Sequence, residues 1–108
     1  MEPFALVTKN MWYVYLLISK KDNSWYIGCT EDLKERFKKH NKGECKYTKD
    51  HKPFILVYYE AGLDKKDAYR RERYLKSGYG RRYLRKRIRY YLEKNGLIDS
   101  GRKAIRDC

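Results

Sequence analysis

The feature that most constrains this chain is its longest continuous apolar stretch, Met11 to Ile18 (MWYVYLLI). Aromatic and branched residues dominate it, which is typical of a β-strand. Alternation along a strand divides its side chains between two faces, with Tyr13, Tyr15 and Leu17 on one and Trp12, Val14, Leu16 and Ile18 on the other. Both sets are apolar, so the pattern predicts a strand covered on both sides. The stretch is far shorter than the ~20 residues of a membrane-spanning helix.

Two further strands are expected. Ser19 to Ser24 (SKKDNS) has the composition of a hairpin turn, and Trp25 to Cys29 (WYIGC) follows it as the second strand. Pro53 precedes the third, Phe54 to Tyr59 (FILVYY), and Glu60-Ala61-Gly62 is its expected exit.

Three helices are expected between and after these strands. Thr30 is expected to cap the first, over residues 31–41, and Gly43 to end it. Asp64 opens the second, which ends near Ser77-Gly78, and the third spans about 80–94.

The predicted order is therefore strand, strand, helix, strand, helix, helix. The fold class is α/β, with a small three-stranded, mainly antiparallel sheet flanked by three helices. A chain of 108 residues has room for one such core. We expect a flexible arm at residues 1–10, a single domain over 11–94 and a short appendage at 95–108.

The charge balance indicates a polyanionic partner. Lys and Arg number 27 against 14 Asp and Glu, which leaves a net charge of +13, and 16% of the residues are aromatic. This combination favours nucleic acid, DNA first, over a disordered basic tail. Cys29, Cys45 and Cys108 form no Cys-x-x-Cys pair, so free thiols in a reducing compartment are expected. We expect a cytoplasmic monomer with no membrane partner.

The first helix carries polar residues on its apolar side. Leu33, Arg36, Phe37 and His40 fall at i, i+3, i+4 and i+7 and share one stripe. Leu33 and Phe37 must face the sheet, so Arg36 and His40 lie beside that contact. Arg36 either reaches water from the margin or serves a site, because burying an unpaired guanidinium is costly.

The second helix repeats the anomaly. Ala68, Glu72, Leu75 and Tyr79 define its inward side, and Glu72 lies in the middle of it. Glu72 is either a structural ion pair, with Arg36 or Lys76 as its partner, or a metal ligand. Helix spacing alone does not decide between these.

The third helix has an ordinary apolar stripe and a strongly basic remainder. Opposite charges that would pair with these cations are nearly absent, so an external phosphate is favoured as their partner. The candidate nucleic-acid contacts on the second and third helices are Lys76, Arg81, Arg82, Arg85, Lys86 and Arg89.

The hairpin motifs Tyr13-Val14-Tyr15 and Tyr26-Ile27-Gly28 resemble the signature of the GIY-YIG nuclease superfamily. Arg36, His40 and Glu72 stand where that family has an arginine, a histidine in several members, and a metal-binding glutamate. The resemblance covers about residues 11–89 and is closest to small stand-alone members similar to the catalytic domain of the bacterial excision-repair nuclease. The chain departs from the family pattern at two places. Tyr13-Val14 stands in place of Gly-Ile, and Cys29 stands where some members have a lysine. Lys76 or Lys34 would have to take over the role of that lysine.

The resemblance implies a metal-dependent endonuclease acting on DNA. Its catalytic residues would be Tyr15, Tyr26, Arg36, His40 and Glu72. Glu72 would hold Mg²⁺ (or Mn²⁺), Arg36 would clamp phosphate oxygens, and Tyr26 would orient water or phosphate. Tyr15 or His40 would be the general base.

Two other classes of function are open at this stage. One is a nucleic-acid-binding module on the same scaffold without catalysis. The other, a basic scaffold that binds only protein, explains neither Arg36 nor Glu72.

Overall fold

The three expected strands form an antiparallel sheet with β1 in the centre. In the computed structural model, which describes residues 10–97 and 105–106, β1 (Trp12–Ser19) pairs with β2 (Trp25–Thr30) and with β3 (Phe54–Gly62). The order of these strands is β2-β1-β3, as expected for the predicted hairpin and third strand. β3 continues through the expected exit to Gly62, because those residues pair with the first residues of β1.

A fourth, very short strand extends the sheet. β4 (Ile105–Arg106) pairs in parallel with β2 beside Tyr26 and Ile27, which gives the order β3-β1-β2-β4. The prediction of three strands omitted it because two residues carry no periodicity. The expected arm falls on residues outside the described ranges except for Asn10, and so does most of the expected appendage.

The first helix, α2 (Leu33–Lys42), begins later than predicted. Its N-cap is Asp32, whose side chain accepts a hydrogen bond from the Glu35 amide at 3.1 Å. Thr30, the predicted cap, instead ends β2, where it pairs with Tyr13. Gly43 closes the helix in the left-handed conformation with φ of 78°, as expected.

The second helix was predicted correctly and the third was not. α3 (Lys65–Lys76) starts after Asp64, which accepts hydrogen bonds from two amides of the first turn. The predicted third helix is two helices, α4 (Gly78–Arg87) and α5 (Arg89–Lys94), separated at Ile88 with φ −116° and ψ 28°. The described residues therefore contain four α-helices rather than three, and a short 3₁₀ turn, η1 (Lys49–His51).

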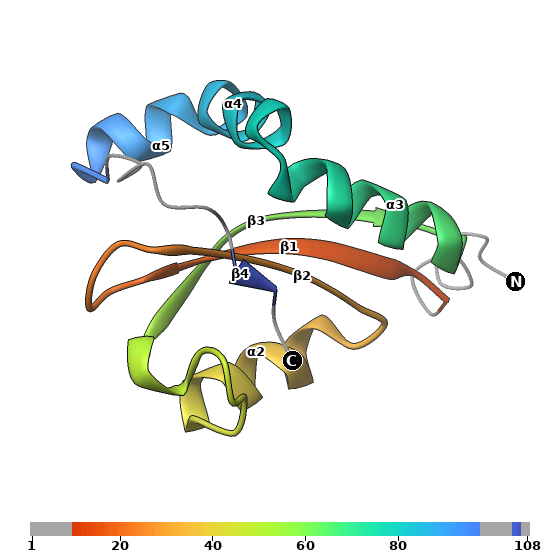
Figure 1. Cartoon of the computed structure of the whole chain (residues 1–108), viewed down its shortest axis with the longest axis horizontal. Coiled ribbons are helices and arrows are strands. Elements are labelled where there is room, and N and C mark those ends of the chain that lie inside the picture. The colour runs from red at the N-terminus through yellow and green to blue at the C-terminus, as the bar shows by residue number, and fades with distance from the viewer. Residues whose placement is uncertain (1–9, 98–104, 107–108) are drawn as a thin grey trace, which may run out of the picture.

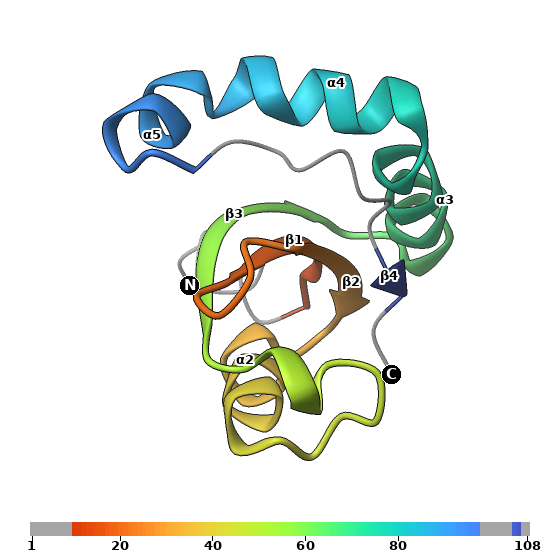
Figure 2. The ribbon, with the colours of Figure 1, turned by 60° about the vertical axis from the view of Figure 1, so that its left-hand side comes forward.

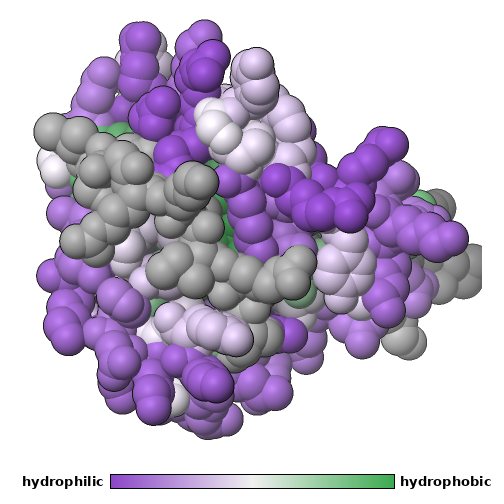
Figure 3. Space-filling view, in the orientation of Figure 1, coloured by the Kyte–Doolittle hydropathy of each residue, from purple (hydrophilic) through white to green (hydrophobic). Residues whose placement is uncertain are grey.

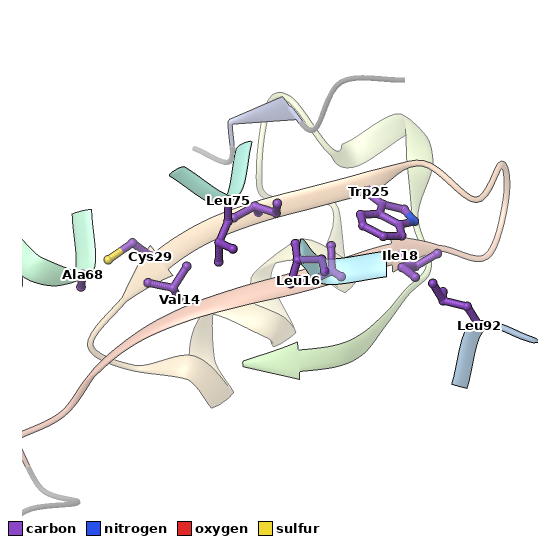
Figure 4. Packing of buried hydrophobic residues seen from close by; sticks show 10 residues of the cluster. Val14, Leu16, Ile18, Trp25, Cys29, Ala68, Leu75 and Leu92 are labelled. Atoms are coloured by element: carbon purple, nitrogen blue, oxygen red, sulfur yellow. The ribbon is translucent and has the colours of Figure 1, made fainter. Parts of the chain in front are cut away.

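The sheet is covered on both faces, as its alternating apolar residues predict. In Figure 1, α2 lies on one side of the sheet and α3, α4 and α5 lie on the other, and Figure 2 shows the same layers after rotation. Even-numbered residues of β1 pack with Trp25, Cys29, Ala68, Leu75 and Leu92 on the α3–α5 side (Figure 4). On the α2 side, Tyr15, Leu17, Tyr26 and Phe54 form a second cluster with Leu33 and Phe37.

The cysteine expectation holds in part. Cys29 is a buried thiol in the α3-side cluster. For Cys45 the expectation is wrong, because this buried residue is disulfide-bonded, and Cys108 lies outside the described residues. In the described part of the chain, none of the helices has the length and apolar character that crossing a membrane requires.

Candidate active site

Two tyrosines of the hairpin share the face of the sheet that α2 covers. Tyr15 on β1 lies opposite Gly28, and Tyr26 on β2 lies opposite Leu17. The two tyrosines are therefore diagonal neighbours on the same face. Both are fully buried, with 1% of Tyr15 and 0% of Tyr26 exposed.

Helix α2 brings His40 to Tyr15. The buried or half-buried positions of this helix include Leu33, Arg36, Phe37 and His40, the stripe that the sequence predicts. The Nε2 atom of His40 lies 3.1 Å from the Tyr15 hydroxyl, and the ring is fully buried. On the other side of the ring, Nδ1 lies 2.8 Å from Oγ1 of Thr48, which is also fully buried. A buried chain of three polar side chains thus joins β1, α2 and the loop after α2.

Tyr26 is enclosed by two rings from the segment before and at the start of β3. Phe54 meets it edge to face at 5.3 Å between centroids, and the His51 ring lies at 5.5 Å. His51 in turn contacts Asp22 of the hairpin turn through Nδ1 and Oδ2 at 2.6 Å. Burial raises the pKa of the Asp22 carboxyl, but hydrogen bonds from Ser24, His51 and Ser19 outweigh it and hold that pKa well below its usual range.

Glu72 lies in a different layer from the tyrosines. It is on α3, where its neighbours Ala68 and Leu75 pack into the cluster on the far face of the sheet. Glu72 is 5% exposed, and its carboxylate forms an ion pair with Lys76, with Nζ 3.0 Å from Oε2. This is one of the two ion pairs that the sequence left open. The structure thus brings Tyr15, Tyr26 and His40 together, with Arg36 one turn earlier on α2, and leaves Glu72 across the sheet.

The donor chemistry of Glu72 decides which metal site it fits. Among the described residues, no three or more His, Cys, Asp or Glu side chains are grouped so that they could hold a metal ion. Magnesium, however, keeps several of its waters and needs only one or two carboxylates. Glu72 supplies an oxygen donor of this kind, but its carboxylate is buried and paired with Lys76, so it could hold a water-rich Mg²⁺ (or Mn²⁺) ion only once that ion pair opens.

The predicted basic face is exposed only in part. Arg82, Arg85, Lys86 and Arg89 are exposed and border a hollow of about 560 Å³ where α5 turns away from α4. The described surface seen in the orientation of Figure 1 is mostly hydrophilic (Figure 3). Lys76 is bound to Glu72, and Arg81 is buried with its guanidinium over the Trp25 ring at 5.6 Å. The exposed cations lie on the opposite side of the sheet from α2.

Three residues near the tyrosines were not predicted from the sequence to belong to the site. Thr48 lies in a polar loop, His51 ends the short 3₁₀ turn η1 and Asp22 lies in the hairpin turn, and in such segments no periodicity indicates which side chains face inward. Only their contacts with His40 and Tyr26 identify them. A second hollow, of about 450 Å³, opens on the same face and includes Tyr13 and Tyr59 in its lining.

This chain is similar to a known family and to several known proteins. Residues 11–84 match the family described as the GIY-YIG catalytic domain. The UPF0213 protein YazA of Bacillus subtilis is 37% identical over 83 residues, which cover 76% of this chain and 79% of that protein. A UPF0213 protein of Pediococcus acidilactici is 35% identical over 94 residues, covering 84% and 90%. The solution NMR structure of the UPF0213 protein BH0048 from Bacillus halodurans is 35% identical, covers 84% of this chain and 88% of its own, and has a TM-score of 0.36.

Proposed function

We propose that this chain, which belongs to the GIY-YIG family, is a metal-dependent endonuclease that hydrolyses phosphodiester bonds in DNA. The family match over residues 11–84 confirms the resemblance seen in the sequence. The observation that carries the proposal is the 3.1 Å contact between the Tyr15 hydroxyl and His40 Nε2, with Tyr26 on the adjacent strand. Both tyrosines and the histidine lie within the matched segment.

Hydrolysis needs a base that takes a proton from the attacking water. Tyr15 and His40 are the candidates, and they are hydrogen-bonded to each other, so a proton accepted by one affects the other. A phenol with an ordinary pKa of about 10 needs help to act as a base near neutrality. Tyr26, on the same sheet face, would orient water or phosphate.

The negative charge of the phosphate would be neutralised by one cation of the protein and one metal ion from solution. Arg36, on the sheet-facing side of α2, would clamp the non-bridging oxygens. Glu72 would hold Mg²⁺ (or Mn²⁺), and a bound ion would supply positive charge to the phosphate and to the leaving 3′ oxygen. Tyr15, His40 and Glu72 are buried, and Glu72 lies across the sheet from the other two. The proposal therefore includes a rearrangement before the chemistry that exposes these side chains and brings Glu72 to the same phosphate.

The exposed cations of α4 and α5 would supply phosphate contacts away from the site of cleavage. Together with the net charge of +13, they support binding to DNA whose strength falls steeply with salt. We propose that the protein binds DNA as a monomer.

A cleavage assay tests the proposal. Purified protein is incubated with branched, flapped, single-stranded and duplex DNA in Mg²⁺, in Mn²⁺ and in a chelator. We expect cleavage of at least one DNA form with either metal and none with the chelator, and we expect Tyr15→Phe to lose cleavage while it still binds DNA. Absence of cleavage on every DNA form in both metals would refute the proposal.

A second candidate function is a nucleic-acid-binding module that does not cut. The observations that favour it are the burial of Tyr15 and Tyr26 and the ion pair that Glu72 forms with Lys76. The same assay separates the two functions, because a binding module retains DNA in a salt-sensitive manner and leaves it intact in every metal condition.

A further inference from the structure

We propose that Thr48 is a positioning residue that fixes the proton of neutral His40 on Nε2 and so directs that N–H at the Tyr15 phenol oxygen. The inference rests on the proposed function only where it concerns catalysis. Its structural part concerns which ring nitrogen of His40 carries a proton, and that can be measured without any cleavage.

The loop after α2 holds Thr48 rigidly against His40. The Thr48 amide donates to the Cys45 carbonyl at 3.2 Å, and the Thr48 carbonyl accepts from the His51 amide at 2.9 Å. The side chain is fully buried, with Oγ1 at 2.8 Å from Nδ1 of His40. Phe54 and Tyr15 meet the imidazole edge to face at 5.9 and 6.0 Å, which hinders rotation of the ring.

The proton of the Thr48 hydroxyl decides the tautomer of His40. A hydroxyl has one proton to donate, and a buried donor without an acceptor is costly. Among the described residues, His40 Nδ1 is the acceptor within hydrogen-bond distance of Oγ1. The hydroxyl therefore donates to Nδ1, which must then carry a lone pair. In a neutral imidazole the proton is consequently on Nε2.

This tautomer assigns the roles of Tyr15 and His40. The Nε2–H group donates to the Tyr15 oxygen across the 3.1 Å contact. A hydrogen bond donated to a phenol oxygen favours the ionised form of the phenol. Nε2 also has no lone pair with which to accept a proton from Tyr15. Once Tyr15 has lost its own proton to solvent, its phenolate is thus the base that takes a proton from the attacking water, and His40 is the donor that supports this phenolate.

Two substitutions at Thr48 form a matched pair. Thr48→Val keeps the branched shape and removes the hydroxyl, whereas Thr48→Ser keeps the hydroxyl. The chain has 2 histidines, so the ring nitrogens of His40 are assigned in ¹⁵N-labelled protein by comparison with His51→Gln. At a pH where His40 is neutral, we expect protonated Nε2 and unprotonated Nδ1 in the wild type and in Thr48→Ser. In Thr48→Val we expect a substantial population with the proton on Nδ1.

Cleavage gives the second readout. Loss of the hydrogen-bond partner that orients a metal-binding histidine typically lowers activity by about 10- to 100-fold. By analogy, we expect a loss of this size for Thr48→Val, with DNA affinity unchanged. Thr48→Ser should restore the rate.

Protonated Nδ1 in the wild type would overturn the inference, even if Thr48→Val does not fold. A Thr48→Val protein that keeps both the wild-type tautomer and the wild-type rate would overturn it too. If the wild type itself cuts no DNA, the proposed function fails, and the ring-nitrogen spectrum still decides the inference.

Discussion

Alanine at Gly80 is a sharp test of how α4 is placed, because α4 begins directly against the end of α3. A Cβ atom added at Gly80 would lie 2.1 Å from the Tyr74 carbonyl oxygen and 2.3 Å from the Leu75 Cα. Both atoms belong to the backbone, so no side-chain rotation can relieve the contact. A Cβ atom added at Gly78, which is also in α4, would meet nothing within 4 Å.

The two positions should therefore respond with opposite signs. Overpacking costs about 1–3 kcal/mol, and a rigid backbone clash belongs at the upper end of that range. Alanine regains up to about 1 kcal/mol of helix propensity over glycine. The net expectation is a loss of about 2 kcal/mol for Gly80→Ala and a gain of up to about 1 kcal/mol for Gly78→Ala.

Equilibrium unfolding in urea measures both free energies of unfolding, with equal slopes required for a valid comparison. A Gly80→Ala protein as stable as the wild type, or equal changes in the two variants, would refute the close crossing of α3 and α4.

Three further predictions concern stability and binding. Burial raises the pKa of Glu60, but hydrogen bonds from Arg71 and Tyr58 outweigh it and hold that pKa below its usual range. The ionised Glu60 carboxylate therefore stabilises the fold fully above about pH 4.3, and this stabilisation is lost as the pH falls through the folded-state pKa. Glu60→Gln should thus cost about 1–2 kcal/mol at pH 7 and clearly less at pH 3 in urea titrations, and an equal loss at both would contradict it. Asp32→Ala should remove the cap of α2 and cost about 1 kcal/mol, while Glu31→Ala, which removes no cap, should cost little in the same assay. The predicted phosphate contacts that are exposed on α4 and α5 are Arg82, Arg85, Lys86 and Arg89. Neutralising all four together should weaken DNA binding and make its affinity less dependent on salt. An unchanged salt dependence would exclude them as phosphate contacts.

Local patterns predicted the layers of the fold. Alternation along β1 assigned its side chains to the correct faces, because both faces are buried and a one-residue slip would exchange them. Asp64 marked the start of α3, because a capping side chain bonds only to amides of its own first turn. The stripe on α2 placed His40 toward the sheet, where it meets Tyr15.

Features that depend on distant partners could not be predicted. Thr30 and Asp32 are both good caps, and pairing of Thr30 with Tyr13 on another strand decides between them. The third helix divides at Ile88 without the glycine or proline that usually marks a break. Arg81 was predicted to contact phosphate from its place in a basic run, but it lies buried against Trp25 of the hairpin.

The partners of the site residues also come from outside their own elements. Thr48 orients toward His40 from a loop in which polar composition alone indicates solvent exposure. Glu72 was correctly marked as an unusual carboxylate, but spacing could not choose between an ion pair and a metal ligand.

Metal-dependent cleavage by Glu72→Gln is the most direct test of the central claim, because this residue is the proposed holder of the ion. The matched control is Glu44→Gln, which changes an exposed glutamate of the loop after α2. If the protein is a metal-dependent nuclease, Glu72→Gln should lose about 10²-fold or more of the Mg²⁺-dependent rate, as expected when charge stabilisation of the reacting phosphate is removed. The rate of Glu44→Gln and the DNA affinity of both variants should stay close to wild type. Equal cleavage by wild type and Glu72→Gln at every Mg²⁺ concentration would contradict the account.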